Sequence, residues 1–191
     1  MSELGKSSCG SPEHGINDSL MGMWVANYAA RTPDCQAARD ATWEMLDDSP
    51  QPDAHLIIKK EFGGHSRRGK YFSGAPELVA ETCVSSRSYD LHQKLDLYLE
   101  AGVDEYVAVL VEEREIRWMR RAGRLFQPIK PGRDGIIHSR LFGGLWLDPN
   151  VVLACDGARV LDTLDLGLAS PDHAAFCVKL ERKRADWERS K

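Results

Sequence analysis

The sequence has 191 residues, of which 42% are hydrophobic and 28% are charged, and its formal net charge is -4. This composition matches an average folded domain and excludes a disordered or collagen-like chain, and the length suits one domain with a buried core. The longest apolar runs are strand-length, far below the roughly 20 residues that cross a bilayer, so no membrane span is expected. Because the chain is acidic overall, any binding to nucleic acid must depend on local basic patches.

The N-terminus and the cysteines bear on the compartment. The first ten residues lack the apolar segment of a secretory signal, which predicts a cytosolic protein. Five cysteines, an odd number without a Cys-x-x-Cys pair, argue against a disulfide framework and against a structural zinc site. We expect reduced thiols that are mostly buried.

The first half of the chain predicts one helix and two strands. Apolar residues recur at helical spacing from Ile16 to Tyr28 and stop before Pro33, which predicts a helix from about residue 16 to 30. Residues 41–46 are compatible with a strand or a helical turn, and we favour the strand. Residues 54–58 predict a strand, and residues 59–76, rich in glycine and basic residues, predict an exposed loop.

The second half predicts a βαβ unit from about residue 78 to 111. Residues 78–84 form a near-continuous apolar run typical of a buried strand, with Glu81 in its middle. Leu95, Tyr98 and Leu99 then mark a helix that ends at Gly102, and residues 106–111 are a second buried strand. Residues 115–120 and 124–127 predict a hairpin, residues 160–166 a short helix, and residues 179–191 a charged amphipathic tail. The expected fold class is α/β with a mixed central sheet flanked by helices.

Three charged residues on neighbouring predicted elements could carry metal-assisted hydrolysis. Asp53 begins a strand, Glu81 lies inside the next long one, and Lys94 borders the apolar stripe of the following helix. Mg²⁺ prefers one or two carboxylates together with waters and a substrate phosphate oxygen. A bound Mg²⁺ lowers the pKa of an attacking water, and a nearby lysine can orient that water or the phosphate. Two acids and a lysine therefore suffice for cleavage of a phosphodiester bond.

Three sequence segments carry a resemblance to a known family. They are Pro52-Asp53 at a strand start, residues 74–85 around Glu81, and residues 90–106, in which Lys94 precedes Tyr98 and an Ala-Gly-Val-Asp-Glu-Tyr run. In this order they are similar to the signature of the Uma-type family of restriction-endonuclease-like proteins, in the PD-(D/E)XK nuclease superfamily. The similarity covers about residues 14–150 and is best over residues 74–106.

The resemblance implies a site, a cofactor and a fold. It implies that Asp53 and Glu81 bind Mg²⁺, for which Mn²⁺ can substitute, and that Lys94, displaced from the strand to the helix, is the catalytic lysine. This displacement explains why Cys83 stands where the superfamily usually places that lysine. His14 resembles a histidine often found before the first helix in the family, and Val107 departs from the family's usual tryptophan.

The implied architecture is a restriction-endonuclease-like domain over residues 14–155. Residues 1–13 are expected to be a flexible N-terminus, and residues 156–191 a helical or charged tail. The implied partner is DNA, and a homodimer would suit the cutting of two strands, although no residue demands one. Five basic residues of the loop between the two acids could contact backbone phosphates, and a solvated loop is equally compatible: Lys59, Lys60, Arg67, Arg68 and Lys70.

Simpler structural roles stand beside these functional ones. Glu81 and Lys94 could be a structural ion pair, and Lys94 could extend from the edge of the stripe to water. Tyr98 is better explained by core packing and His55 by a structural role. A non-catalytic binding or assembly module with the nuclease fold is therefore the main alternative to a DNA endonuclease. A phosphoesterase acting on small nucleotides is the third hypothesis.

Overall fold

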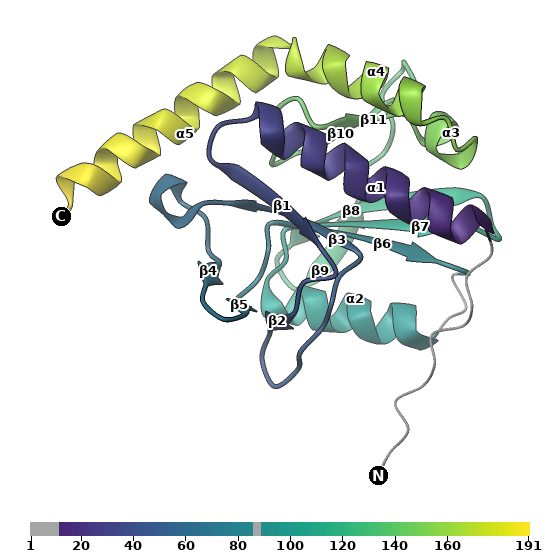
Figure 1. Ribbon diagram of the computed structural model, residues 1–191, viewed down its shortest axis with the longest axis horizontal. Coiled ribbons are helices and arrows are strands. Elements are labelled where there is room, and N and C mark those ends of the chain that lie inside the picture. The colour runs from purple at the N-terminus through teal and green to yellow at the C-terminus, as the bar shows by residue number, and fades with distance from the viewer. Residues whose placement is uncertain (1–11, 86–88) are drawn as a thin grey trace.

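The computed structural model describes residues 12–85 and 89–191, and its centre is a six-stranded sheet covered by helices on both faces (Figure 1). The helical segments are α1 Pro12–Arg31, the 3-10 turn η1 Lys60–Phe62, α2 Tyr89–Ala101, α3 Pro149–Leu153, α4 Gly157–Leu168 and α5 Pro171–Arg189. The strands of the central sheet are β1 Cys35–Arg39, β3 Ala54–Ile58, β6 Leu78–Cys83, β7 Glu105–Leu110, β8 Glu115–Ala122 and β9 Leu125–Pro128. Two small sheets contain β2 Trp43–Glu44, β4 Arg67–Arg68 and β5 Phe72–Ser73, and β10 Ile137–His138 and β11 Trp146–Leu147.

The central sheet is mixed, with the strand order β1-β3-β6-β7-β8-β9. β6 and β7 are parallel, whereas the other neighbouring strands of this sheet are antiparallel. The α2 helix connects β6 to β7, because parallel neighbours need a long crossover. The α/β class, the mixed sheet flanked by helices and the βαβ unit are therefore confirmed, and β8 and β9 form the expected hairpin.

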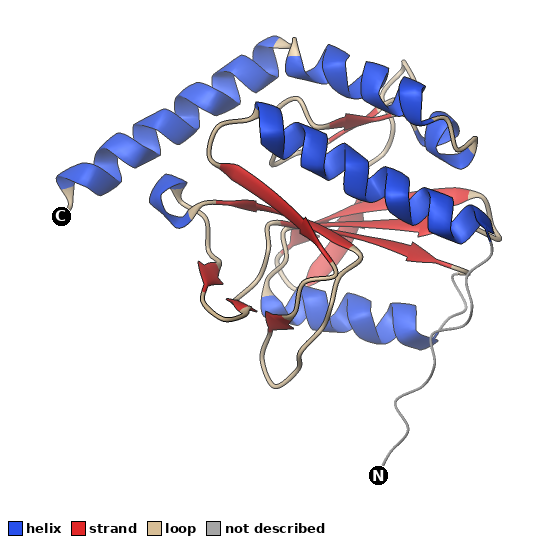
Figure 2. Ribbon diagram, viewed as in Figure 1, coloured by secondary structure: helices blue, strands red, loops and turns tan. Residues whose placement is uncertain are grey.

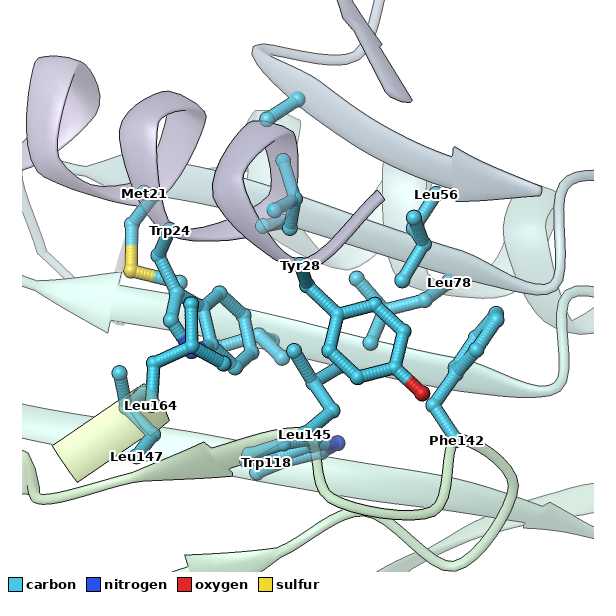
Figure 3. Close-up of a cluster of buried hydrophobic side chains, with 14 of the residues drawn as sticks. Met21, Trp24, Tyr28, Leu56, Leu78, Trp118, Phe142, Leu145, Leu147 and Leu164 are labelled. Atoms are coloured by element: carbon cyan, nitrogen blue, oxygen red, sulfur yellow. The ribbon is translucent and has the colours of Figure 1, made fainter. Parts of the chain in front are cut away.

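Side chains alternate between the two faces of the sheet and supply two cores. On the α1 face, Trp24 packs edge-on against Trp118 with their ring centroids 5.3 Å apart, and Tyr28 donates a hydrogen bond to the Gly143 carbonyl at 2.7 Å (Figure 3). On the α2 face, Tyr98 and Tyr106 are buried together. α1, α3 and α4 cover one face and α2 the other (Figure 2).

Helix starts and stops follow their local sequence. Asp156 caps α4 by accepting from the Arg159 amide, and Ser170 caps α5 just before Pro171 at the first helical position. Gly102, with φ of 98°, ends α2 in the left-handed conformation that glycine adopts without strain. The expected short helix and tail beyond residue 150 are three helices, of which α5 is the longest.

Several elements differ from expectation. β1 was not predicted, because residues 35–39 are small or polar and show no alternation of strand type. β2 is only two residues long, within the segment where a strand was favoured. α1 begins at Pro12 rather than near residue 16, and residues 1–11 of the expected N-terminal segment lie outside the described residues.

Cysteines and membrane segments can be compared with expectation in the described ranges. Cys35, Cys83, Cys155 and Cys177 are free thiols, of which only Cys35 is fully buried, so the expectation that most are buried is wrong for these four. Between residues 12–85 and 89–191, no helix is long and apolar enough to cross a membrane.

Candidate metal and catalytic site

The two predicted acids lie side by side on neighbouring strands. β3 and β6 pair antiparallel with Ala54 opposite Ala80, so the same register continued by one residue sets Asp53 opposite Glu81. Directly opposed residues of an antiparallel pair have Cβ atoms about 4.5–5.5 Å apart. The pairing of these strands therefore brings together two carboxylates that are far apart in the sequence.

Glu81 is buried with a donor on each carboxylate oxygen. Its side chain is 2% exposed, the Tyr98 hydroxyl donates to Oε1 at 2.6 Å, and the Lys94 ammonium donates to Oε2 at 3.1 Å. Burial raises the pKa of Glu81 to about 7 and the charge of Asp53 adds to the rise, whereas Lys94 and Tyr98 oppose it. Near neutral pH this carboxylate is poised between its protonated and ionised forms.

Tyr98 has two roles at this position. It is fully buried and packs in the α2-face core, as expected. Its hydroxyl also bonds to Glu81, and burial next to that carboxylate raises its own pKa well above the ordinary value, so it stays protonated and remains a donor. The sequence pattern predicted the packing and missed the hydrogen bond.

Asp53 is fixed by the strand that carries its partner. Its Oδ2 accepts a hydrogen bond from the Thr82 amide at 2.7 Å, and its Oδ1 accepts none from the described residues. His14 approaches the same peptide segment from α1, with Nε2 2.8 Å from the Thr82 carbonyl oxygen. Because a carbonyl only accepts, this His14 nitrogen is the donor and carries a proton. Thr82 thus connects Asp53 and α1 through its backbone.

An acid and an arginine border this pair of carboxylates. The Arg39 guanidinium bonds to Asp18 Oδ2, and the Arg39 stem crosses Gly22, where an added Cβ would lie 2.4 Å from Arg39 Cδ. Burial raises the pKa of Asp18 and the nearby charge of Asp53 adds to the rise, whereas Arg39 lowers it. Gly22 therefore makes room for an arginine beside the carboxylates.

His55, two residues after Asp53, has a structural environment. It is fully buried between Trp43 and Phe72, and its Nδ1 accepts a hydrogen bond from the Trp43 indole at 3.3 Å. Burial lowers its pKa to about 4, so it is neutral and its proton is on Nε2. These contacts make His55 a poor metal ligand.

The five basic residues of the predicted DNA-binding loop lie in two places. Lys59 and Lys60 follow the end of β3 opposite to Asp53, about 20 Å away at the usual rise per strand residue. Arg67 and Arg68 form β4, and Lys70 follows in the β4–β5 turn. They are not gathered around the carboxylates, and they line the edge of the sheet instead.

The donor set fits a magnesium ion better than a structural metal. In the described parts of the chain, no group of three or more histidine, cysteine or acidic residues could hold a metal. Mg²⁺ commonly binds only one or two carboxylates and keeps its waters, whereas structural zinc needs four protein ligands. Asp53 and Glu81 therefore suit a hydrated divalent ion shared with a phosphate.

Comparison with known proteins identifies the family. The family model Uma2, described as "Putative restriction endonuclease", matches residues 3–150, well over half of the sequence. The chain belongs to the Uma2 family. No curated protein matches the sequence. Among solved structures, a crystal structure described as a putative nuclease belonging to DUF820, from Anabaena variabilis ATCC 29413, is similar in fold with a TM-score of 0.61 and 14% identity. The similarity covers 76% of this chain and 83% of that chain.

The Uma2 resemblance led to Asp53, Glu81 and Lys94 but not to Asp18 and Arg39. Asp18 lies on α1 and Arg39 at the end of β1, which the sequence did not reveal as a strand. The one signal was Gly22 inside an otherwise helical pattern, since a mid-helix glycine often marks a close approach. Nothing in the sequence indicated which residue approaches it.

Proposed function

We propose that this protein is a metal-dependent DNA endonuclease with its reactive centre at Asp53, Glu81 and Lys94. The observation that carries the proposal is the opposition of Asp53 and Glu81 on adjacent strands, with Lys94 Nζ 3.1 Å from Glu81. Membership of the Uma2 family supports it independently. In this proposal the nuclease domain spans residues 14–155, and Mn²⁺ can replace Mg²⁺.

The side chains would divide the work by their chemistry. Asp53 and Glu81 would hold the divalent ion, which, when bound, acidifies water and neutralises phosphate charge. Lys94, which is bonded to Glu81, would orient the attacking water in line with the bond from phosphorus to the 3′ oxygen. That bond breaks as the water oxygen bonds to phosphorus, which leaves a 5′-phosphate and a 3′-hydroxyl. Tyr98 would favour the ionised form of Glu81 by donating a hydrogen bond to it.

The five basic residues are proposed to bind the DNA backbone away from the reacting phosphate. Lys60, Arg67, Arg68 and Lys70 form no ion pair with any described residue, so they are available to phosphates. Lys59 lies 3.7 Å from Asp34, half-exposed, where salt and phosphate can compete with that pair. We also propose a cytosolic location, and a homodimer when both strands of a duplex are cut.

The decisive experiment measures cleavage of supercoiled and linear DNA. Wild type, Glu81→Ala and Lys94→Ala are purified identically and incubated with Mg²⁺, Mn²⁺ or EDTA. We expect metal-dependent cutting by wild type alone, and the variants control for contaminating nucleases. Equal cutting by all three proteins would contradict the proposed site.

A non-catalytic binding module is the second candidate, favoured by the closed contacts of Glu81. With Tyr98 and Lys94 both bonded to it, Glu81 is satisfied without a metal. This candidate predicts no Mg²⁺ affinity, so a thermal shift with Mg²⁺ that vanishes in Asp53→Ala would exclude it. A phosphoesterase specific for small nucleotides predicts turnover of those compounds and none of DNA, which the same preparations test.

A further inference from the structure

The C-terminal helix α5 lies beyond the residues that the Uma2 model matches and reaches back to the far end of β3. It follows α4 and ends beside the η1 turn (Figure 1). Phe176 and Leu180 are its buried residues, both in its first half. The second half of α5 is charged, and its partly or fully exposed side chains contact the η1 turn.

The contacts between α5 and η1 are made by cations and aromatic rings. Lys60 Nζ lies 5.8 Å from the ring centroid of Trp187, and Lys191 Nζ lies 5.2 Å from the same ring. Lys183 crosses Gly63, where an added Cβ would lie 2.6 Å from its Nζ. A bulkier residue at position 63 would displace Lys183, so Gly63 allows the Lys183 side chain to lie against the turn that follows η1.

Four surface hollows join this region to the β1 edge of the central sheet, and the one along β1 is lined by His55, two residues after Asp53. The largest, of about 790 Å³, runs along β1 and is lined by Arg68, Lys70 and Tyr71. It shares Arg68 with a hollow of about 410 Å³ that also contains Lys59 and Lys60. Lys60 lines a third hollow, and Lys59 lines a fourth. Trp187 lines both of these last two, so the hollows form one track, which we call the β1–α5 track.

The β1–α5 track concentrates unpaired positive charge on an acidic protein. Six of its basic residues form no ion pair with any described residue: Lys60, Arg67, Arg68, Lys70, Lys183 and Lys191. Of its acids, Asp34, Asp186 and Glu188 are each paired with a basic residue, whereas Glu61 forms no ion pair with any described residue and offsets one of the six positive charges. Like charges gathered in this way repel one another and attract a polyanion. The rings of Tyr71, 42% exposed, and Trp187 hold three of these cations in place, with Lys70 over Tyr71 and Lys60 and Lys191 over Trp187.

We propose that α5 and η1 form a second phosphate-binding surface, so that DNA held at Asp53 and Glu81 continues along the β1–α5 track to Trp187. The part that concerns Asp53 and Glu81 rests on the proposed function, whereas the binding surface itself does not. The roughly 20 Å from Asp53 to Lys59 corresponds to about six nucleotides of one strand at 3.4 Å each. Nucleic acid is the occupant that this spacing of cations and rings fits.

The test is the salt dependence of binding to a labelled 30-base-pair DNA duplex in EDTA, measured by fluorescence anisotropy. The test variant is Lys183→Ala with Lys191→Ala. The control is Lys179→Ala with Arg182→Ala, which removes the same charge from exposed positions of the same helix that line none of the four hollows. Thermal melting checks that both variants fold.

We expect the slope of log affinity against log salt to become shallower by about two in the test variant, since each lost phosphate contact removes about 0.9. The control should keep the wild-type slope. An unchanged slope in the test variant, or equal changes in both variants, would overturn the proposal. Because no cleavage is needed, the two proposals can fail separately: binding without cutting refutes the nuclease, and cutting with an unaltered slope refutes the α5 surface.

Discussion

The buried carboxylate of Glu81 contributes to the pH dependence of the stability of the metal-free protein, and the substitution Glu81→Gln should remove that contribution. The folded pKa of about 7 lies above the ordinary 4.5, so the folded state binds this proton more tightly than the unfolded state does. The stabilisation from Glu81 is complete below pH 4.5 and is lost as the pH rises through 7. At 1.36 kcal/mol per pH unit, the loss is about 3 kcal/mol.

The measurement is the free energy of urea unfolding in EDTA between pH 5 and 8.5. Glu77, Glu105 and Asp18 also have raised pKa values and change stability in the same direction, so the quantity of interest is the difference between variant and wild type. In Glu81→Gln the fall in stability from pH 5 to 8.5 should be smaller by about 3 kcal/mol. Glu44→Gln, which removes an exposed glutamate on β2, should follow wild type.

Parallel pH curves for wild type and Glu81→Gln would refute the buried, raised-pKa environment of Glu81. Added Mg²⁺ gives a second readout at pH 8. If the ion binds the ionised site, it restores stability to wild type and not to the variant, because a ligand of the folded state alone stabilises that state.

Three other substitutions test the neighbours of this site and the loop that closes the core. Tyr98→Phe removes a hydrogen bond that stabilises the charged form of Glu81 by about 1.5 kcal/mol. The pKa of Glu81 should therefore rise by about one pH unit. The Mg²⁺ affinity, measured by calorimetry, should fall about fivefold at pH 7 and recover at pH 9. Tyr28→Phe, which loses a buried hydrogen bond on the other face, should leave that pH profile unchanged. Lys94→Met should abolish DNA cleavage while Mg²⁺ still binds at pH 9, and cleavage near the wild-type rate would count against its role. Glu105→Ala removes the acceptor of the Trp118 indole, the Ser139 hydroxyl and the Arg140 amide. Urea unfolding should therefore show a loss of about 3–5 kcal/mol, and a loss under 1 kcal/mol would contradict this expectation.

The sequence predicted the βαβ unit because each of its three elements has a recognisable pattern within its own residues. Residues 78–84 and 106–111 are apolar without alternation, which is how strands covered on both faces look, and Gly102 marks the end of the helix between them. The position of Lys94 at the edge of the apolar stripe follows from helical geometry, and in the structure this lysine reaches Glu81.

The remaining features depend on contacts that no local pattern contains. β1 is a strand because it pairs with β3, although its small and polar residues have no strand signature. Once β1 is absent from a prediction, Arg39 cannot be placed opposite Ala54, nor Asp18 beside Arg39. The β1–α5 track likewise depends on α5 returning to η1, which its sequence of alternating charges does not indicate.

Asp53 also terminates the ladder between β3 and β6, because its carboxylate takes the Thr82 amide that would otherwise face a strand neighbour. That N–H is bonded to a side chain, so its exchange with solvent deuterium reports on how long the Asp53 side chain stays in its folded position. If Asp53 also binds the metal, as proposed, the separation of β3 from β6 at this end is coupled to occupancy of the site. Slow exchange at Thr82 therefore measures how often the two strands separate, and any ligand of Asp53 that requires the paired strands would slow it further.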